Sequence, residues 1–522
     1  MARALDEPTP SVITPGPRQR GLWLAVLAAA VLRLWNLGEQ SLWVDEIFTW
    51  QTSSPHGPLL WSDVVQNLNS PLISAFSHFW MKLAGDSEFA LRLPMALASI
   101  ALVPAVAVLA RRIAGEETFL PAAWLTALSP FVTWYGQEFR GYIFAILFAT
   151  LAILALLDLQ ERGRRRDLFL LAGWTVLGAL SNMSVALLVP VFAAALVLSP
   201  PPGRGRLAMP LAYLGLLALA LSPWILHHLV QRLGWLEWER LVPGRVANPA
   251  EEPLRGETTF SWLGIPFTFY VLSVGYTLGP SLRDLHAGAN LRTLLPFAPG
   301  ILASAVTFGL LAVVGAGALG EAKADRSRAR CGLLFAVLLV PIVAVTYFAV
   351  SNFKVYNPRY VAVATPAYFC LLAAGWASLA RPARRLSAAA VLVLFAVAYL
   401  HQGWGARYAK DDFKRATHAL DVVVAPQDVI VAAGNFSPLE YYWRDREPVP
   451  VVYWVGYARD ERMEPRFRAL LNPAGPTWLV ISRPHDLDPE GRFEMWVQAT
   501  WGAPVGRFPG VRVYRIEAPT GP

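Results

Sequence analysis

Residues 88–110 read EFALRLPMALASIALVPAVAVLA, a run that is apolar apart from Ser99 and, near its start, Glu88 and Arg92. A run of about 20 apolar residues has the length needed to cross the hydrocarbon core of a membrane, whereas soluble cores offer shorter and periodic runs. Ten similar runs occur elsewhere in the chain. All eleven lie at residues 21–37, 88–110, 118–135, 141–157, 168–181, 184–198, 207–226, 297–319, 332–350, 361–379 and 386–403. The sequence therefore predicts an all-α polytopic membrane protein with about eleven transmembrane helices.

The composition of the 522-residue chain agrees with this prediction. Hydrophobic residues make up 55% of it, charged residues make up 16%, and the mean hydropathy is +0.41, which excludes a soluble enzyme of this length. The net charge of +8 is spread over short clusters between apolar runs and forms no single patch, so no nucleic-acid partner is expected. Cys331 and Cys370 lie in or beside apolar runs and are interpreted as packing residues.

The basic clusters predict the orientation of the chain. They comprise Arg18 and Arg20, Arg111 and Arg112, residues 162–166, Arg204 and Arg206, residues 323–330, and residues 381–385. Eleven crossings place all of them on one side, which the positive-inside rule identifies as the cytoplasm. The C-terminus then lies outside, and residues 1–20 form a disordered cytoplasmic tail. The first run is interpreted as a retained anchor and not a signal peptide, because it continues past three alanines without a cleavage pattern.

Two long segments of the 21–403 transmembrane region fall on the outer side, at residues 38–87 and 227–296. The first contains an amphipathic piece at 45–53 and an apolar piece at 71–85 that is too short to cross, so the latter is expected to lie in the outer interface. The second must cross an even number of times, and residues 260–279 are expected to form an interfacial or re-entrant helix.

Residues 404–522 have a different character. Strand-like runs at 429–433, 449–453, 478–482 and 511–516 alternate with helix-like runs at 411–424, 438–444, 459–471 and 489–500. This alternation predicts a small soluble α/β domain outside the membrane. It contains no glycine-rich phosphate loop and no spacing typical of a metal site.

Two adjacent carboxylates, Asp45 and Glu46, follow the first run in the sequence SLWVDE at 41–46. A carboxylate in a partly desolvated groove at the membrane surface has a raised proton affinity and can act as a general base. The same pair could instead begin a helix, with Asp45 as its cap and Glu46 in its first turn. The residues alone leave both interpretations open.

A second outer group, WYGQEFRGY at 134–142, contains Glu138, Arg140 and Tyr142. The planar guanidinium of Arg140 is suited to a lipid phosphate, and the alternative is a self-contained Glu138–Arg140 pair beside interfacial aromatics.

Further outer cations lie in the sequence NFKVYNPRY at 352–360, which also contains Tyr360. Lys354 and Arg359 lie there against the positive-inside trend, so an anionic partner is expected for them. Arg33, in the first run, is expected either to extend outward to the interface or to meet the same anion.

These pieces, in this order, resemble the glycosyltransferase family 39 membrane enzymes, which include protein O-mannosyltransferases, lipid A aminoarabinose transferases and bacterial transferases acting on cell-envelope polymers. The resemblance covers roughly residues 20–380. It is carried by LWVDE at 42–46, SPL at 70–72, GDSE at 85–88, LRLP at 91–94, SP at 129–130, QEFRGY at 137–142 and PRY at 358–360. The chain departs from the family pattern at Asn69-Ser70-Pro71, where members often have His-Pro-Pro.

The resemblance implies a GT-C fold, a polyprenyl-phosphate sugar donor, a cell-envelope acceptor and a place in the inner membrane of a bacterium. It implies that Asp45 is the base of an inverting single displacement and that Glu46 orients it or holds the acceptor. Arg140, with Lys354 and Arg359 as weaker candidates, would neutralise the departing lipid phosphate. Glu138 would position Arg140, and Tyr142 and Tyr360 would support the site.

No cofactor is required by this chemistry, and no metal ligands are assigned. His227 and His228, with Glu237 and Glu239, are the set that could bind a divalent ion. A transporter or lipid-carrier flippase is the rival function, but it would carry charged or broken helices at the bilayer midplane, whereas the charges here gather at one outer surface. A second rival is a non-catalytic partner whose α/β domain binds an envelope polymer.

Overall fold

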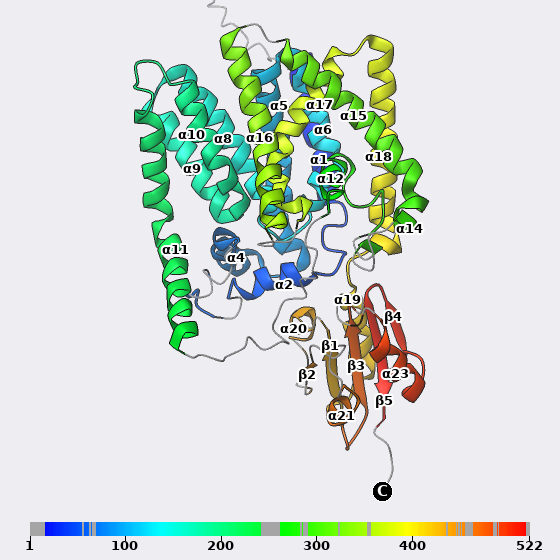
Figure 1. The fold of residues 1–522 in the computed structure, drawn as a ribbon. Coiled ribbons are helices and arrows are strands. Elements are labelled where there is room, and N and C mark those ends of the chain that lie inside the picture. Colours follow the sequence, from blue (N-terminus) through cyan, green and yellow to red (C-terminus); the bar gives the residue numbers. More distant parts are fainter. Residues whose placement is uncertain are drawn as a thin grey trace, which may run out of the picture.

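The structure is a computed structural model. It describes residues 16–517 apart from 55–56, 62–63, 65–68, 242–260, 282–283, 286–290, 322–323, 352–355, 435–436, 445, 447–448, 450, 455–462, 484–487 and 489. A bundle of long helices makes up most of the molecule, and a small domain with a β-sheet lies at one end of it (Figure 1).

All eleven predicted apolar runs are helical. Among the described residues, seven helices are long and apolar enough to cross a membrane. They are α5 (Glu88–Ala114), α8 (Tyr142–Arg162), α11 (Ala208–Leu241), α15 (Ala298–Gly320) with the short helices before it, α16 (Asp325–Val350), η4 with α17 (Pro358–Ser378), and α18 (Arg381–Trp404). The other four runs form α1 (Pro17–Leu34), α6 (Phe119–Leu128) with α7 (Pro130–Gly136), α9 (Arg165–Ser181), and η2 with α10 (Met183–Leu198). The chain is a multi-pass membrane protein, as predicted.

The break between α6 and α7 explains the position of Arg33. Pro130 has no N–H group, so the carbonyl of Thr126 lacks its helical donor, and the guanidinium of Arg33 donates to it at 2.8 Å. The same side chain donates to the carbonyl of Ala127 and the hydroxyl of Ser99, and it is fully buried. Both expectations for Arg33 were therefore wrong, because it neither extends outward nor faces an anion site: it caps a broken helix.

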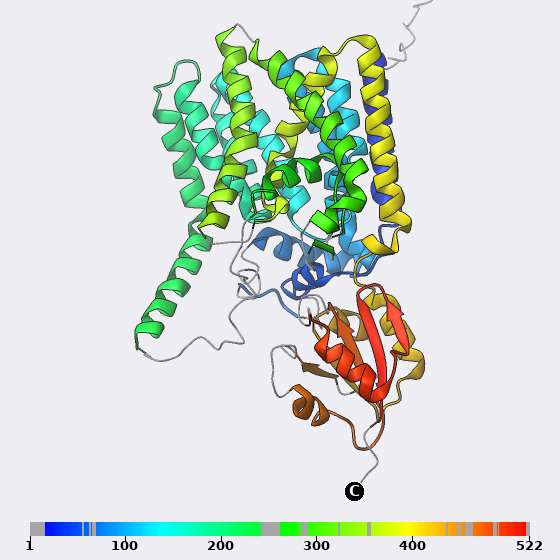
Figure 2. The same ribbon diagram turned by 45° about the vertical axis from the view of Figure 1, so that its right-hand side comes forward.

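The basic clusters lie at one end of the bundle. Arg18 pairs with Glu116 at 2.9 Å, Arg112 pairs with Asp158 at 2.6 Å, and Arg330 donates to the carbonyl of Arg112 at 3.0 Å. The C-terminal domain lies at the opposite end (Figures 1 and 2). This arrangement is what an odd number of crossings requires, and the assignment of the basic end to the cytoplasm stays a prediction.

Short helices cover the end of the bundle that faces the C-terminal domain. The predicted interfacial pieces form α2 (Val44–Gln51) and α4 (Pro71–Ala84), and both lie at the end of the bundle nearest that domain (Figure 1). In the second outer segment α12 (Gly264–Val274) is too short to cross, and α11 runs well past the predicted end of its apolar run. Figure 2 shows the end of α11 projecting from the bundle.

The C-terminal domain has a five-stranded sheet in the order β2-β1-β3-β5-β4. Strands β1 (Val429–Ala433), β2 (Val451–Trp454) and β3 (Thr477–Ser482) are parallel, whereas β5 (Val511–Ile516) and β4 (Gly506–Phe508) are antiparallel. One face packs on α19 (Phe413–Val423) and α20 (Ser437–Trp443), and the other packs on α21 (Met463–Arg468) and α23 (Arg492–Trp501). The four predicted strands are confirmed, and the prediction missed β4 because three residues carry too little pattern.

The domain is held to the bundle through the first outer segment. The hydroxyl of Tyr441 donates to the carbonyl of Asp86 at 2.6 Å, and Arg444 pairs with the carboxylate of Asp86 at 3.1 Å. The backbone N–H of Leu42 donates to the hydroxyl of Tyr442 at 2.7 Å. These contacts place the C-terminal domain directly against the loop that carries Asp45 and Glu46.

We predict that the basic end faces the cytoplasm. Reporter fusions at Pro202 and Ala383, which lie at that end, should report cytoplasm, and fusions after Gly403 or at Pro522 should report the outside. A cytoplasmic C-terminal reporter would contradict both the orientation and an outward-facing site.

Candidate active site

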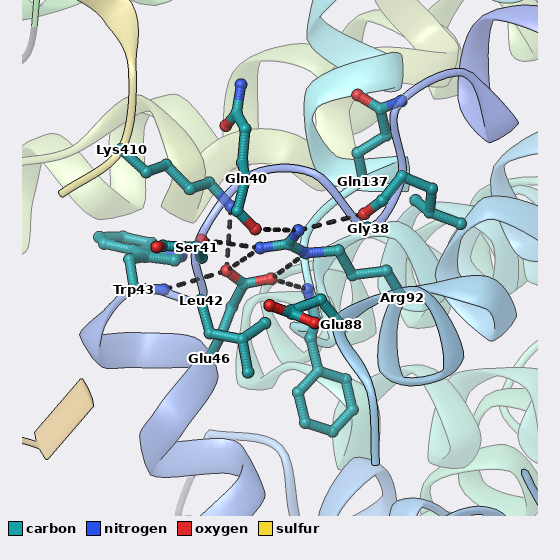
Figure 3. A network of polar contacts seen from close by, with 12 residues as sticks. Gly38, Gln40, Ser41, Leu42, Trp43, Glu46, Glu88, Arg92, Gln137 and Lys410 are labelled. Carbon is teal, nitrogen blue, oxygen red and sulfur yellow. Dashed lines mark hydrogen bonds and ion pairs between the residues drawn. The ribbon is translucent and has the colours of Figure 1, made fainter. Parts of the chain in front are cut away.

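Four segments far apart in the sequence meet at the end of the bundle that faces the C-terminal domain. They are the loop before α2, the turn between α7 and α8, the short helix η4 (Pro358–Ala364), and the linker that follows α18. Figure 3 shows the polar contacts that join the first, second and last of these segments around Glu46.

Glu46 lies at the centre of this meeting point and is fully buried. Its Oε1 accepts from Arg92 Nε and from the N–H of Phe139, both at 2.8 Å. Its Oε2 accepts from Arg92 Nη2 at 2.9 Å, from Lys410 Nζ at 3.0 Å and from the N–H of Trp43 at 3.2 Å (Figure 3). These bonds join α5, the α7–α8 turn and the C-terminal linker to the first loop.

The surroundings of Glu46 fix its charge. Burial alone would raise the pKa of this carboxyl, but the charges of Arg92 and Lys410 and the hydrogen bonds lower it to about 2. A group that stays ionised and has every lone pair engaged cannot exchange protons with a substrate. We therefore assign Glu46 to the scaffold of the site, where it orients the residues around it.

The helix-capping interpretation applies to Glu46 and not to Asp45. Helix α2 is capped at Trp43, whose N–H is satisfied by Glu46, the third residue of the helix. Asp45 instead pairs with Arg359, with Oδ2 and Nη1 at 2.9 Å. The two side chains are 28% and 25% exposed, so both groups remain within reach of a ligand.

Arg140 holds the backbone of Asp45. Its Nη1 donates to the Asp45 carbonyl at 3.0 Å and to the hydroxyl of Thr49 at 2.8 Å. The side chain is 6% exposed, and its Nε has no hydrogen-bond partner among the described residues. This placement indicates that Arg140 positions Asp45 and does not contact a ligand directly.

Glu138 does not form an ion pair with Arg140 in the described part of the chain; only their backbones are bonded, at 2.7 Å. Its side chain is buried, and its Oε1 has no hydrogen-bond partner among the described residues. Burial raises the pKa of Glu138 to about 7, with Lys410 opposing the rise and Glu46 and Asp45 adding to it. Glu138 is thus the carboxyl of the site whose pKa lies near neutral pH.

The remaining predicted site residues are placed as follows. Tyr142 is buried, with its ring 5.0 Å from that of Tyr135. The guanidinium of Arg359 lies over the ring of Tyr360 at 5.4 Å, which helps to fix its direction. Lys354 lies outside the described residues.

A cavity of about 130 Å³ is lined by Arg359, the ion-pair partner of Asp45, but not by Asp45 itself. Its wall includes the aromatic side chains of Trp43, Trp134, Tyr135, Tyr276 and Tyr408. Glu138, Arg359 and Lys410 also line it. Aromatic faces with a few polar groups among them suit a sugar ring, which is apolar on its faces and polar at its edges.

Sequence reasoning missed Arg92 and Lys410. A charged residue within an apolar run is a signal for a buried partner, so Arg92 could have been found from its position in LRLP. Lys410 gives no such signal, because it stands in a polar linker 364 residues from Glu46. Within the described residues no group of three or more His, Cys, Asp or Glu side chains is arranged to hold a metal.

The chain has the GT-C fold that the resemblance implied. It is similar to the crystal structure of ArnT from Cupriavidus metallidurans bound to undecaprenyl phosphate, at TM-score 0.52 and 13% identity over 96% of this chain and 99% of that one. It is also similar to the oligosaccharyltransferase of Archaeoglobus fulgidus in its apo form, at TM-score 0.52 and 11% identity over 91% of this chain and 70% of that one. At such identities these likenesses establish the fold alone.

Residues 69–227 match the model of the family described as dolichyl-phosphate-mannose-protein mannosyltransferase. No curated protein sequence gives a significant match. A further similar structure, of the oligosaccharyltransferase AglB from Archaeoglobus fulgidus in complex with an inhibitory peptide and a dolichol-phosphate, has TM-score 0.50 and 11% identity over 90% of this chain and 69% of that one. The family match and the fold together confirm the resemblance.

Glu46→Gln should destabilise the protein strongly, because it leaves the charges of Arg92 and Lys410 buried without their anion, at a cost of about 3–5 kcal/mol. The melting temperature in detergent measures this. Since the folded pKa of about 2 lies below the ordinary value of 4.5, the stabilisation by Glu46 is complete above pH 4.5 and is lost as the pH falls toward 2. The difference between wild type and variant should therefore shrink as the pH is lowered from 4.5 toward 2.

The matched control is Glu161→Gln. Glu161 also pairs with two arginines, Arg112 and Arg330, but it is 28% exposed and lies at the opposite end of the bundle. Removing the charge of Glu161 should lower the free energy of unfolding by about 1 kcal/mol or less. Equal effects of the two substitutions would contradict a scaffold role for Glu46.

Proposed function

We propose that the protein is a membrane glycosyltransferase that moves a sugar from a polyprenyl-phosphate donor to a cell-envelope acceptor on the outer face of a bacterial inner membrane. The observation that carries the proposal is the Asp45–Arg359 pair, a reachable carboxylate and guanidinium 2.9 Å apart beside an aromatic cavity. Similar structures bind undecaprenyl phosphate and dolichol-phosphate, which are donor carriers of this class.

In the proposed reaction the acceptor hydroxyl attacks the anomeric carbon from the face opposite the phosphate. The new carbon–oxygen bond forms as the bond to the phosphate oxygen breaks, the hydroxyl proton passes to Asp45, and the polyprenyl phosphate departs with the bonding electrons. The configuration is inverted in this single displacement. Arg140 and Glu46 act on Asp45 only indirectly, through the backbone and the first turn of α2.

Arg359 is the residue that we propose to neutralise the departing phosphate. Its guanidinium lies at the cavity wall, and a charge-assisted contact there strengthens as charge develops on the leaving oxygen. A phosphate at Arg359 would compete with Asp45 for the guanidinium, so donor binding would release Asp45 for its role as base. Lys354, four residues from the start of η4, remains a second candidate for this phosphate.

The flippase alternative is less well supported. Arg33, a charge inside a predicted span, is fully engaged with Thr126, Ala127 and Ser99, so it is not available to a translocating headgroup. The reachable charges Asp45 and Arg359 lie at the outer end of the bundle, where transfer to an envelope acceptor would occur.

Asp45→Asn should abolish transfer, because the amide keeps the shape of the side chain but cannot take a proton. Turnover of a polyprenyl-phosphate sugar by purified protein measures this. The matched control is Asp158→Asn, since Asp158 also pairs with an arginine, Arg112, and is 26% exposed, but lies at the opposite end of the bundle. Turnover of Asp45→Asn above about a tenth of wild type, a loss of less than about 1.4 kcal/mol, would exclude Asp45 as the base.

Arg359→Lys should lower kcat more than it weakens donor binding, because the contact with phosphate strengthens toward the transition state and a compact ammonium replaces the planar group poorly. Arg140→Lys, which acts through the backbone of Asp45, should have a smaller effect on kcat, and Arg444→Lys should have little. A larger loss for Arg140→Lys than for Arg359→Lys, at unchanged melting temperatures, would move the phosphate site to Arg140.

A further inference from the structure

More hydrogen-bond donors approach the carboxylate of Glu46 than its lone pairs can accept. Its two oxygens offer about four lone-pair sites, yet five donors approach them within 3.2 Å. Four of these come from Arg92 and from the backbone N–H groups of Phe139 and Trp43, which the fold holds in place. The fifth is the ammonium of Lys410, at the end of a flexible side chain, and it is the surplus donor.

The same cluster also carries surplus charge. Arg92 and Lys410 bring two positive charges to the single negative charge of Glu46, and the Lys410 side chain is only 11% exposed. Burial lowers the pKa of Lys410, although Glu46 and Glu138 oppose this, so the protein keeps a costly cation there. Glu138 faces the same space, but it forms no ion pair with Lys410 within 4 Å in the described part of the chain.

The surplus cation lies at the wall of the candidate site. Lys410 lines the 130 Å³ cavity together with Arg359, which belongs to η4. An ammonium has three donors, and among the described residues its one hydrogen-bond partner is Glu46 Oε2. The other two donors are available to a ligand, and Glu46 would keep four hydrogen bonds if Lys410 moved toward that ligand.

We propose that Lys410 is a donor-binding residue, whose ammonium contacts the phosphate of the polyprenyl carrier opposite Arg359. This inference rests on the proposed function. It adds a phosphate-contacting side chain that the membrane-spanning region does not supply. Two cations from different sides suit a phosphate, which has several charged oxygens, better than the single carboxylate of an acidic sugar. Transfer then leaves the phosphate with additional charge, which both cations can share.

The proposal gives the C-terminal segment a role in the reaction. Arg407, Tyr408 and Lys410 of the linker, and Arg483 of the domain, line the same cavity. The linker is fixed because Arg407 pairs with Asp284 at 2.8 Å and Lys414 pairs with Glu88 at 3.0 Å. Docking of the α/β domain thus completes the donor site.

The test uses undecaprenyl phosphate, which carries the phosphate but no sugar, and full-length protein in nanodiscs. Binding can be followed by tryptophan fluorescence, since Trp43 and Trp134 line the cavity. The near-isosteric Lys410→Met and the polar, uncharged Lys410→Gln should each bind about tenfold more weakly or worse, the loss expected for one charge-assisted hydrogen bond. Lys410→Arg, which keeps the charge, should recover part of the affinity.

The control is Arg415→Met, which removes a cation of the same segment that is 79% exposed and does not line the cavity. It should bind as wild type does, and the uncharged polyprenol should not distinguish any of these proteins. Wild-type affinity for undecaprenyl phosphate in both Lys410→Met and Lys410→Gln would overturn the inference alone. Failure of the wild-type protein to bind undecaprenyl phosphate would overturn the proposed function, and the inference with it.

Discussion

The buried ion pair between Glu46 and Arg92 determines the shape of the end of the bundle that faces the C-terminal domain. Arg92 extends from α5 and, besides Glu46, donates to the carbonyls of Leu37, Gln40 and Ser41. One guanidinium therefore gathers the loop that leads from α1 to α2, a stretch with no regular structure of its own. Because a charge buried without its partner is so costly, this loop has few alternative conformations, and Asp45 is held where α2 begins.

The C-terminal domain depends on the same pair. It rests on the first outer segment through Tyr441, Tyr442 and Arg444, and Lys410 reaches past that segment to Glu46 itself. The loop is therefore packed from both sides, by the helical bundle and by the α/β domain. A module attached only to display a binding surface would not need to place a lysine beside the central carboxylate.

The sequence was sufficient for those features that depend on local pattern. Eleven apolar runs predicted eleven helical segments, and four of the five strands were predicted from alternation with helices. The pairing of distant residues could not be predicted in this way. Arg33 was misjudged because the carbonyls that it satisfies are exposed only by a proline about 100 residues later, and Lys410 was missed because nothing in its own surroundings marks it.

The adjacent carboxylates Asp45 and Glu46 illustrate how position on a helix separates two roles. Consecutive helical side chains point roughly 100° apart, so Glu46 enters the protein toward Arg92 while Asp45 points toward Arg359. Glu46 is fully paired and its pKa is lowered to about 2, whereas Asp45 has one partly exposed ion pair that a ligand can exchange. The buried carboxylate thus keeps α2 in place, and only its neighbour is free to meet a substrate. The Asp-Glu dipeptide therefore serves as one unit, in which the second residue fixes the direction of the first.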